Sequence, residues 1–307
     1  MSAHFDADWL ALREAADAAA RDRALVAALR DWLAERPRPL HITDLGAGSG
    51  TNPRYLAHQL PGPQRWRLLD HDAGLLDRAR KRLADTTDAD GGRVHIKTVY
   101  RDLADAGTAI ATDTDLATAS ALFDLVSADW VEALAARCAV VGCATLWTLS
   151  IDGNWNFIGP DGHRICDAHD TEMLSLLQAH QKREKGLGQA LGGAAPETLR
   201  SAFAHHGYNI AEAPSPWRLV AGSQRELAVS LLDGWRAALH EQAPVARRQI
   251  EAWWRSRRTA ILGGELGVVV GHVDFFAEPP PKPSPKPSPK PSPCFGPQPP
   301  RSCLSGC

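Results

Sequence analysis

Short apolar runs alternate with stretches of helical periodicity along the first half of the chain. Apolar residues between positions 25 and 33 recur on one helix face, and Pro37 and Pro39 end that run, which predicts a helical N-terminal extension over residues 1–39. The strands predicted after it are Leu40–Thr43, Trp66–Leu69, Val94–Val99, Asp115–Ser120 and Ala144–Leu149, and the predicted helices are Thr51–Gln59, Ala73–Leu83 and Trp130–Val140. This alternation predicts βαβ units in an α/β fold, with a parallel sheet covered on both faces.

The alternation ends near Ile151. Asp152–Asp167 is rich in Gly, Asn, Asp and Pro, which predicts a long loop. Residues 152–193 combine this loop with a helix near Met173–His180 and a glycine-rich connector, and we expect this insertion to act as a lid over a substrate. Three later helices (Glu197–Ala204, Leu227–Leu239 and one around Ile250–Trp254) and three strand segments (Tyr208–Ile210, Trp217–Leu219 and Leu266–Phe276) are predicted, the last strand as part of a closing hairpin.

Composition narrows the classes of partner. The formal net charge of −2 gives no overall attraction to nucleic acid or anionic membranes. No apolar run approaches the roughly 20 residues of a membrane span, and the N-terminus lacks the pattern of a secretory signal, so we expect a cytoplasmic protein. The six cysteines include no C-x-x-C pair, and no metal site is expected. Residues 279–307 begin with a proline-rich repeat and are expected to be a disordered tail outside the folded domain, 40–278.

The segment DLGAGSG, Asp44–Gly50, predicts a tight turn between a strand and a helix. Alternating glycines at Gly46, Gly48 and Gly50 allow the main chain to approach a ligand closely. No lysine follows Gly50, so a phosphate-binding P-loop is excluded. Thr51 occupies the third position of the dinucleotide-binding G-x-G-x-x-G pattern, which argues against an NAD-linked oxidoreductase. A carboxylate at Asp44 would repel a pyrophosphate but would attract an ammonium group.

Further polar residues follow the next predicted strands. Asp70 ends one strand and can accept hydrogen bonds from both hydroxyls of a ribose. Asp102 can accept from an adenine amine, Leu103 can offer its main-chain N–H, and Ser120 ends the following strand. Ligands of open α/β sheets bind beyond the carboxyl ends of the strands, so these residues are expected to converge. Each acid has a structural alternative: Asp44 or Asp70 as a helix cap, and Asp102 as a surface acid.

With these residues in place, the chain resembles the class I S-adenosylmethionine-dependent methyltransferases. The matching segments span about residues 40–150 and are DLGAGSG, LLDHDAGLLDRAR (Leu68–Arg80), VYRDLAD (Val99–Asp105) and DLATASALFDLVS (Asp115–Ser127). The resemblance implies a Rossmann-like, doubly wound, seven-stranded sheet with an antiparallel last strand. It also implies S-adenosylmethionine as cofactor. Asp44 and the three glycines would flank its methionine part, Asp70 its ribose and Asp102 its adenine, and Ser120 would lie near the methyl group.

The methyl acceptor is harder to predict, because a methyl sulfonium needs only a well-placed nucleophile and the exclusion of water. Candidate acceptor-side residues are Asp124, Trp130, Trp147, Asp152 and His180, although Trp147 and His180 also fit an ordinary core. The segment after the fourth strand, TASALFD, lacks the [DNS]-P-P-[YF] motif of amino-directed DNA methyltransferases, so a small molecule is the expected acceptor. The alternative function is a catalytically silent cofactor-binding or regulatory protein on the same fold.

Overall fold

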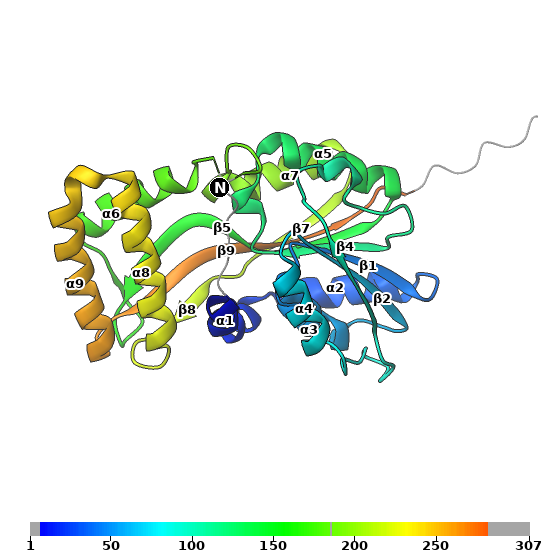
Figure 1. Cartoon of the computed structure of the whole chain (residues 1–307), viewed down its shortest axis with the longest axis horizontal. Helices are drawn as coiled ribbons and strands as arrows, with labels where there is room; N and C mark the ends of the chain where they lie inside the picture. The colour runs from blue at the N-terminus through cyan, green and yellow to red at the C-terminus, as the bar shows by residue number, and fades with distance from the viewer. Residues whose placement is uncertain (1–6, 185, 282–307) are drawn as a thin grey trace, which may run out of the picture.

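A computed structural model describes residues 7–184 and 186–281 of the 307-residue chain. A seven-stranded sheet in the order β3-β2-β1-β4-β5-β9-β7 forms its centre, and two short strands, β6 and β8, pair with β5 and β9 (Figure 1). The strands are β1 Leu40–Leu45, β2 Gln64–Asp70, β3 His95–Tyr100, β4 Leu116–Ser120, β5 Ala144–Ile158, β6 Arg164–Ile165, β7 Asn209–Pro214, β8 Trp217–Leu219 and β9 Gly267–Glu278. The predicted tail lies outside the described residues from position 282 onward.

The direction of the strands confirms the predicted fold class. The pairs β1–β2, β2–β3, β1–β4 and β4–β5 are parallel, whereas β9, the last strand in the chain, runs antiparallel to both β5 and β7. From β1 the chain builds outward through β2 to β3 and then returns to β4 on the other side of β1. The strand order therefore reverses between β1 and β4, which is where ligand sites of doubly wound sheets lie.

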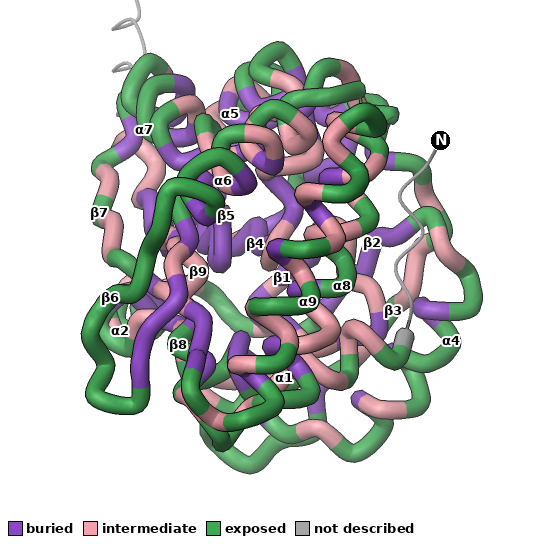
Figure 2. Tube along the Cα trace, turned by 90° about the vertical axis from the view of Figure 1, so that its left-hand side faces the viewer, coloured by how far each residue is buried: buried purple, intermediate pink, exposed green. Residues whose placement is uncertain are grey.

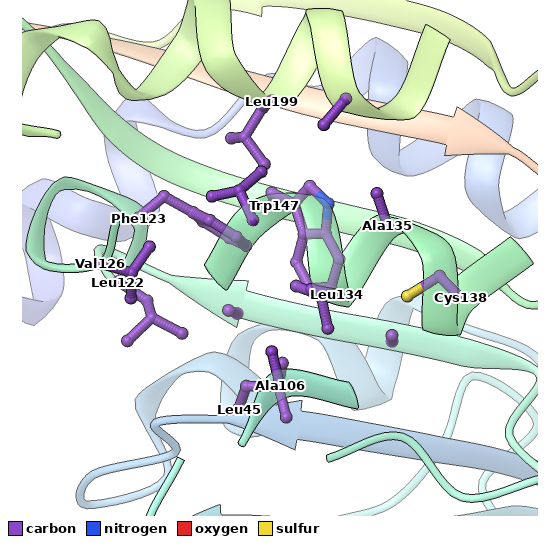
Figure 3. Close-up of a cluster of buried hydrophobic side chains, with 14 of the residues drawn as sticks. Leu45, Ala106, Leu122, Phe123, Val126, Leu134, Ala135, Cys138, Trp147 and Leu199 are labelled. Atoms are coloured by element: carbon purple, nitrogen blue, oxygen red, sulfur yellow. The ribbon is translucent and has the colours of Figure 1, made fainter. Parts of the chain in front are cut away.

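Helices cover both faces of the sheet, as Figure 1 shows. The helices are α1 Ala7–Ala20, α2 Arg23–Ala34, α3 Thr51–Leu56, α4 Ala73–Arg82, α5 Ala128–Val141, α6 Ala168–Gln181, α7 Ala195–His205, α8 Arg225–Gln242 and α9 Arg247–Gly263. Helices α5 and α7 bury one core with Trp147, and α2, α3 and α4 bury another with Leu146 (Figure 3 shows the first). Leu146 and Trp147 belong to opposite cores because successive side chains of a strand point to opposite faces.

The prediction of a loop over Asp152–Asp167 is wrong in its first half. Strand β5 continues to Ile158, and the outer parts of β5 and β9 pair with each other. Trp155 and Phe157 are buried in a third core with α6, α8 and α9, whereas Asn154 before them is exposed and Asn156 between them is half-buried. The glycine and asparagine content favoured a loop, but this period-two burial stabilises a strand. The three helices form a second lobe on the left of Figure 1.

The remaining predictions for the second half of the chain agree more closely with the structure. The late strand is confirmed as β9, although α8, α9 and β8 separate it from β7, so the two strands do not form a tight hairpin. Figure 2 shows buried residues concentrated in the strands and exposed residues on the outer helices and loops. Across residues 7–184 and 186–281, every helix is too short or too polar to cross a lipid bilayer.

Candidate functional site

A cavity of about 460 Å³ opens at the carboxyl ends of the parallel strands. Its wall is built from the turn after β1, the segments that follow β2, β3 and β4, one face of α1, and Gly186 and Leu187 from the 152–193 insertion. This volume falls within the roughly 300–1,000 Å³ typical of small-molecule sites. Seven of the eight predicted cofactor residues are close to this space: six line the cavity, as do Ala47 and Ser49 between the glycines, and Gly50 is the N-cap of α3, between the lining residues Ser49 and Thr51.

The glycine turn has the backbone conformation that requires glycine. Gly46, Gly48 and Gly50 have φ values of +62°, +52° and +81°, in the left-handed region where other residues are strained. A Cβ on Gly50 would lie 2.9 Å from Leu83 and 3.1 Å from the Ala79 Cβ, both on the α4 side. The turn therefore brings α3 close to α4 and leaves the main chain of Gly46–Ser49 exposed to the cavity.

Asp70 is held rigidly at the end of β2. Its Oδ2 accepts a hydrogen bond of 2.8 Å from the Gly48 N–H, and its Oδ1 accepts one of 2.9 Å from the Asp72 N–H. The residue is 6% exposed and lines the cavity. Each carboxylate oxygen can accept more than one hydrogen bond, so both oxygens remain able to accept from a ligand. The glycine turn and the end of β2 are thus joined through this side chain.

The segment after β3 forms the next part of the wall. Asp102 is exposed to the cavity, and its Oδ1 accepts a hydrogen bond of 2.9 Å from the Ala104 N–H. Leu103 is buried, and its carbonyl accepts a hydrogen bond of 2.6 Å from Trp130 Nε1. Tyr100, 71% exposed, also lines this end of the cavity. Trp130 therefore lies behind the wall and fixes the position of Leu103.

Ser120 is the last residue of β4, and its hydroxyl accepts a hydrogen bond from a buried arginine. The Oγ accepts a hydrogen bond of 3.0 Å from Arg21 Nη2, and Arg21 Nη1 donates one of 2.7 Å to Asn52 Oδ1. Ala121, the next residue, has φ +53° and donates its N–H to the Thr148 carbonyl on β5. Backbone strain of this kind is concentrated at functional sites, because the surrounding fold must compensate for it.

Asp44 is placed differently from the other predicted acids. It is 1% exposed, and its Oδ1 accepts a hydrogen bond of 2.6 Å from Asn52 Nδ2. Its Oδ2 has no hydrogen-bond partner among the described residues. Burial raises the pKa of the Asp44 carboxyl to about 7, against the opposing effects of the Asn52 hydrogen bond and of nearby Arg21. Asp44 therefore supports the turn from behind and does not line the cavity.

None of the five acceptor-side candidates belongs to the described cavity lining. Trp147 is fully buried and contacts Phe123 and Phe203 in the core shown in Figure 3. His180 contacts Glu241 at 3.1 Å, within the second lobe. Asp124 lies in the short turn Phe123–Leu125, directly after the segment that lines the cavity, and Asp152 accepts a hydrogen bond from the Asn154 N–H.

Sequence reasoning missed the contribution of α1. Leu10, Arg13 and Asp17 line the cavity from one helix face, at the i, i+3, i+7 spacing. Arg13 makes a two-point contact with Asp17, and Asp17 Oδ1 also accepts a hydrogen bond of 3.0 Å from Trp217 Nε1 on β8. An i, i+4 charge pair in an alanine-rich helix usually marks a solvated face, so the local pattern gave no reason to place it in a wall.

No protein-family model matches the chain, and no curated protein matches its sequence. Among solved structures, the chain is similar to a SAM-dependent methyltransferase from Geobacter sulfurreducens in complex with S-adenosyl-L-homocysteine, with 15% identity, a TM-score of 0.44 and coverage of 90% of this chain and 99% of that one. It is also similar to a cyclopropane synthase from Mycobacterium tuberculosis, with 13% identity, a TM-score of 0.47 and coverage of 89% and 94%.

A third similar structure is phosphoethanolamine N-methyltransferase 2 from Haemonchus contortus in complex with S-adenosyl-L-methionine, with 16% identity, a TM-score of 0.39 and coverage of 85% of this chain and 53% of that one. With TM-scores below 0.5 and such low identities, these similarities do not establish an activity for this chain. The case for a function depends on the residues of the cavity.

Proposed function

We propose that the protein is an S-adenosylmethionine-dependent methyltransferase that acts on a small-molecule acceptor. The observation that carries this proposal is the common placement of Asp70, Asp102 and the glycine turn around one cavity. Asp70 ends β2 and Asp102 follows the neighbouring strand β3, and the Asp70 carboxylate accepts a hydrogen bond from the Gly48 N–H. An adenosine that carries a short polar arm would present its ribose hydroxyls to Asp70, its adenine amine to Asp102 and its arm to the main chain of the glycine turn.

The residues present fit such a cofactor in charge as well as in shape. Asp70 would accept from the ribose hydroxyls, and Asp102 and the Leu103 N–H would contact the adenine edge. Arg13 and Asp17 provide one positive and one negative side chain beyond the glycine turn, which matches the carboxylate and ammonium of an amino-acid arm. A dinucleotide would bring two phosphates close to Asp17, Asp70, Asp72 and Asp102, and like charges would repel it.

The bound cofactor would supply an electrophilic methyl group on a sulfonium. The chain would orient this group and exclude water around it. Leu122, Leu125 and Leu187 give the wall beyond Ser120 an apolar character, which favours water exclusion. Leu187 comes from the 152–193 insertion, and the Ser127 N–H donates to its carbonyl at 3.1 Å. We propose that this insertion covers the acceptor, which would enter beside the apolar wall.

Binding is tested first, by calorimetry with S-adenosylhomocysteine and with NAD. We expect S-adenosylhomocysteine to bind and Asp70→Asn to weaken it at least tenfold, since the amide loses charged acceptor capacity toward the ribose. Asp85→Asn is the matched control, because Asp85 is an exposed acid whose side chain is 95% accessible. Tighter binding of NAD, or unchanged affinity in Asp70→Asn, would refute the cofactor assignment.

Turnover is tested separately, by measuring S-adenosylhomocysteine released from S-adenosylmethionine with a panel of small amines, alcohols, thiols and carboxylates. We expect at least one acceptor class to accelerate release, and Asp70→Asn to lose that acceleration at subsaturating cofactor. Cofactor binding without turnover on any acceptor class would favour the silent binding protein instead.

A further inference from the structure

We propose that Glu132, His205 and His206 form a binding site for a divalent transition metal, of which Zn²⁺ is the representative ion. The site lies between α5 and α7, and its residues are separate from those that line the cofactor cavity. The inference does not depend on the proposed methyltransferase function. It also departs from the sequence-based expectation that the chain has no metal site.

The three side chains present their ligand atoms to a common point. One imidazole nitrogen from each histidine and one carboxylate oxygen of Glu132 lie within 4.8 Å of one another. His206 Nε2 and Glu132 Oε1 are 2.8 Å apart, and the two imidazole rings are 5.1 Å apart between centroids at an angle of 82°. Zinc binds such atoms at about 2.0–2.2 Å, so modest side-chain rotation closes the set around one ion.

The backbone positions of the ligands are fixed by the fold. His205 is the last residue of α7, and the His206 N–H caps that helix by donating to the Ala202 carbonyl. The following turn is anchored by Tyr208, whose hydroxyl donates to the Cys143 carbonyl at 3.0 Å. Leu134 on α5 and Phe203 on α7 are buried in one core. The helices therefore hold Glu132 near the two histidines, although 74 positions separate Glu132 from His206.

The side chains themselves remain adjustable. Glu132 and His205 are exposed, and His206 is half-buried. Rotation of Glu132 and His205 therefore disturbs no core packing, and water can fill the remaining coordination positions. Two imidazoles and one carboxylate favour Zn²⁺, Ni²⁺ or Cu²⁺ over Mg²⁺ and Ca²⁺, which prefer sets made only of oxygen. The site would link α5 to α7.

A hydrogen-bonded pair alone would also account for His206 and Glu132. His205 distinguishes the two explanations, because a pair does not need it and a metal site does. The structure offers a matched control in His163, whose Nδ1 is 3.1 Å from Asp161 Oδ2 in another exposed histidine–carboxylate pair.

The test is titration of the full, chelator-treated chain with ZnCl₂ by calorimetry, together with the Co²⁺ absorption spectrum, which separates nitrogen and oxygen ligation from thiolate ligation. We expect a binding event without a thiolate signature. His205→Ala and His206→Ala should each weaken this event at least tenfold, Glu132→Gln should weaken it as well, and His163→Ala should leave it unchanged.

Circular dichroism and the melting temperature without metal check that each variant is folded. His205→Ala is the decisive variant, since His205 is exposed and its truncation leaves the His206–Glu132 pair intact. Unchanged zinc affinity in folded His205→Ala, or a Co²⁺ spectrum showing only thiolate ligation, would overturn the proposal. Absence of any zinc binding by the wild-type chain would overturn it equally.

Discussion

The guanidinium of Arg21 donates a hydrogen bond of 3.0 Å to the Ser120 hydroxyl and so connects the junction of α1 and α2 to the tip of β4. Arg21 is 4% exposed and stacks 4.5 Å from the Tyr55 ring centre. Burial lowers its pKa, and Asp17, Asp274 and Asp44 oppose that effect. Because Arg21 also binds Asn52, which in turn binds Asp44, one chain of contacts supports both the glycine turn and Ser120.

Replacement of Arg21 by lysine should weaken cofactor binding. A lysine ammonium keeps the charge but cannot reproduce the planar fork that reaches Asn52 and Ser120 together. We expect Arg21→Lys to raise the dissociation constant for S-adenosylhomocysteine about tenfold, equivalent to about 1.4 kcal/mol. Arg54→Lys is the control, since Arg54 is half-exposed and pairs with Glu14. Equal affinities in both variants, measured by calorimetry below their melting temperatures, would contradict a positioning role for Arg21.

Alanine at Gly50 should destabilise the protein more than alanine at another glycine with the same backbone angle. Gly50 and Gly91 both have φ +81°, but a Cβ meets Leu83 and Ala79 only at Gly50, and nothing lies within 4 Å at Gly91. We expect Gly91→Ala to cost about 1–2 kcal/mol from the backbone alone. Gly50→Ala should cost about 1–3 kcal/mol more from crowding against α4.

Urea unfolding of both glycine variants measures the difference directly. Since Gly50 is the N-cap of α3 next to the cavity, Gly50→Ala should also weaken cofactor binding, whereas Gly91→Ala should not. Equal losses of unfolding free energy in the two variants would show that the turn tolerates a side chain and that α3 and α4 are less closely packed.

The buried Asp44 carboxyl should make stability depend on pH. Its pKa of about 7 in the folded state lies above the ordinary value of 3.8 for an aspartic acid, so the folded protein binds this proton more tightly than the unfolded chain. The associated stability is fully present below about pH 4 and is lost as the pH rises through about 7. Asp44→Asn removes this titration and keeps an acceptor for Asn52.

The free energy of unfolding of Asp44→Asn should therefore rise relative to wild type between about pH 4 and pH 7, by a few kcal/mol, and level off above pH 7. Urea unfolding of the ligand-free protein at a series of pH values measures this difference. A constant difference across the range would mean that Asp44 titrates normally and is better solvated than its burial indicates.

Loss of the Trp130 indole N–H should loosen the part of the cavity wall formed by Asp102 and Leu103. Trp130→Phe keeps most of the ring but leaves the buried Leu103 carbonyl without its partner, at a cost of about 1–3 kcal/mol in stability. Affinity for S-adenosylhomocysteine should fall as well, because Leu103 lines the cavity. Trp254→Phe, which removes an exposed bond to Asp233, should change stability by less than about 0.5 kcal/mol.

The sequence by itself determined the parallel part of the sheet, the glycine turn and the acids at the strand ends. Strand and helix periodicity located β1 to β4, and parallel strands necessarily bring Asp70 and Asp102 to one edge. These features depend on local pattern and on a general rule of sheet topology. Of the three acids predicted for the cofactor, Asp44 is the one that does not line the cavity, because its side chain lies against Asn52 behind the turn, an orientation that spacing along the chain does not encode.

Only the tertiary structure decided the second lobe and the composition of the cavity wall. The outer half of β5 is a strand because β9, more than 100 positions later, pairs with it and a core of α6, α8 and α9 covers it. The sequence pattern alone indicates solvated helix residues at Arg13, Asp17 and Arg21. Only the packing of α1 over the sheet edge brings them to the site. Their roles arise from contacts with Trp217 and Ser120, and contacts between residues so distant in sequence leave no local periodicity to recognise.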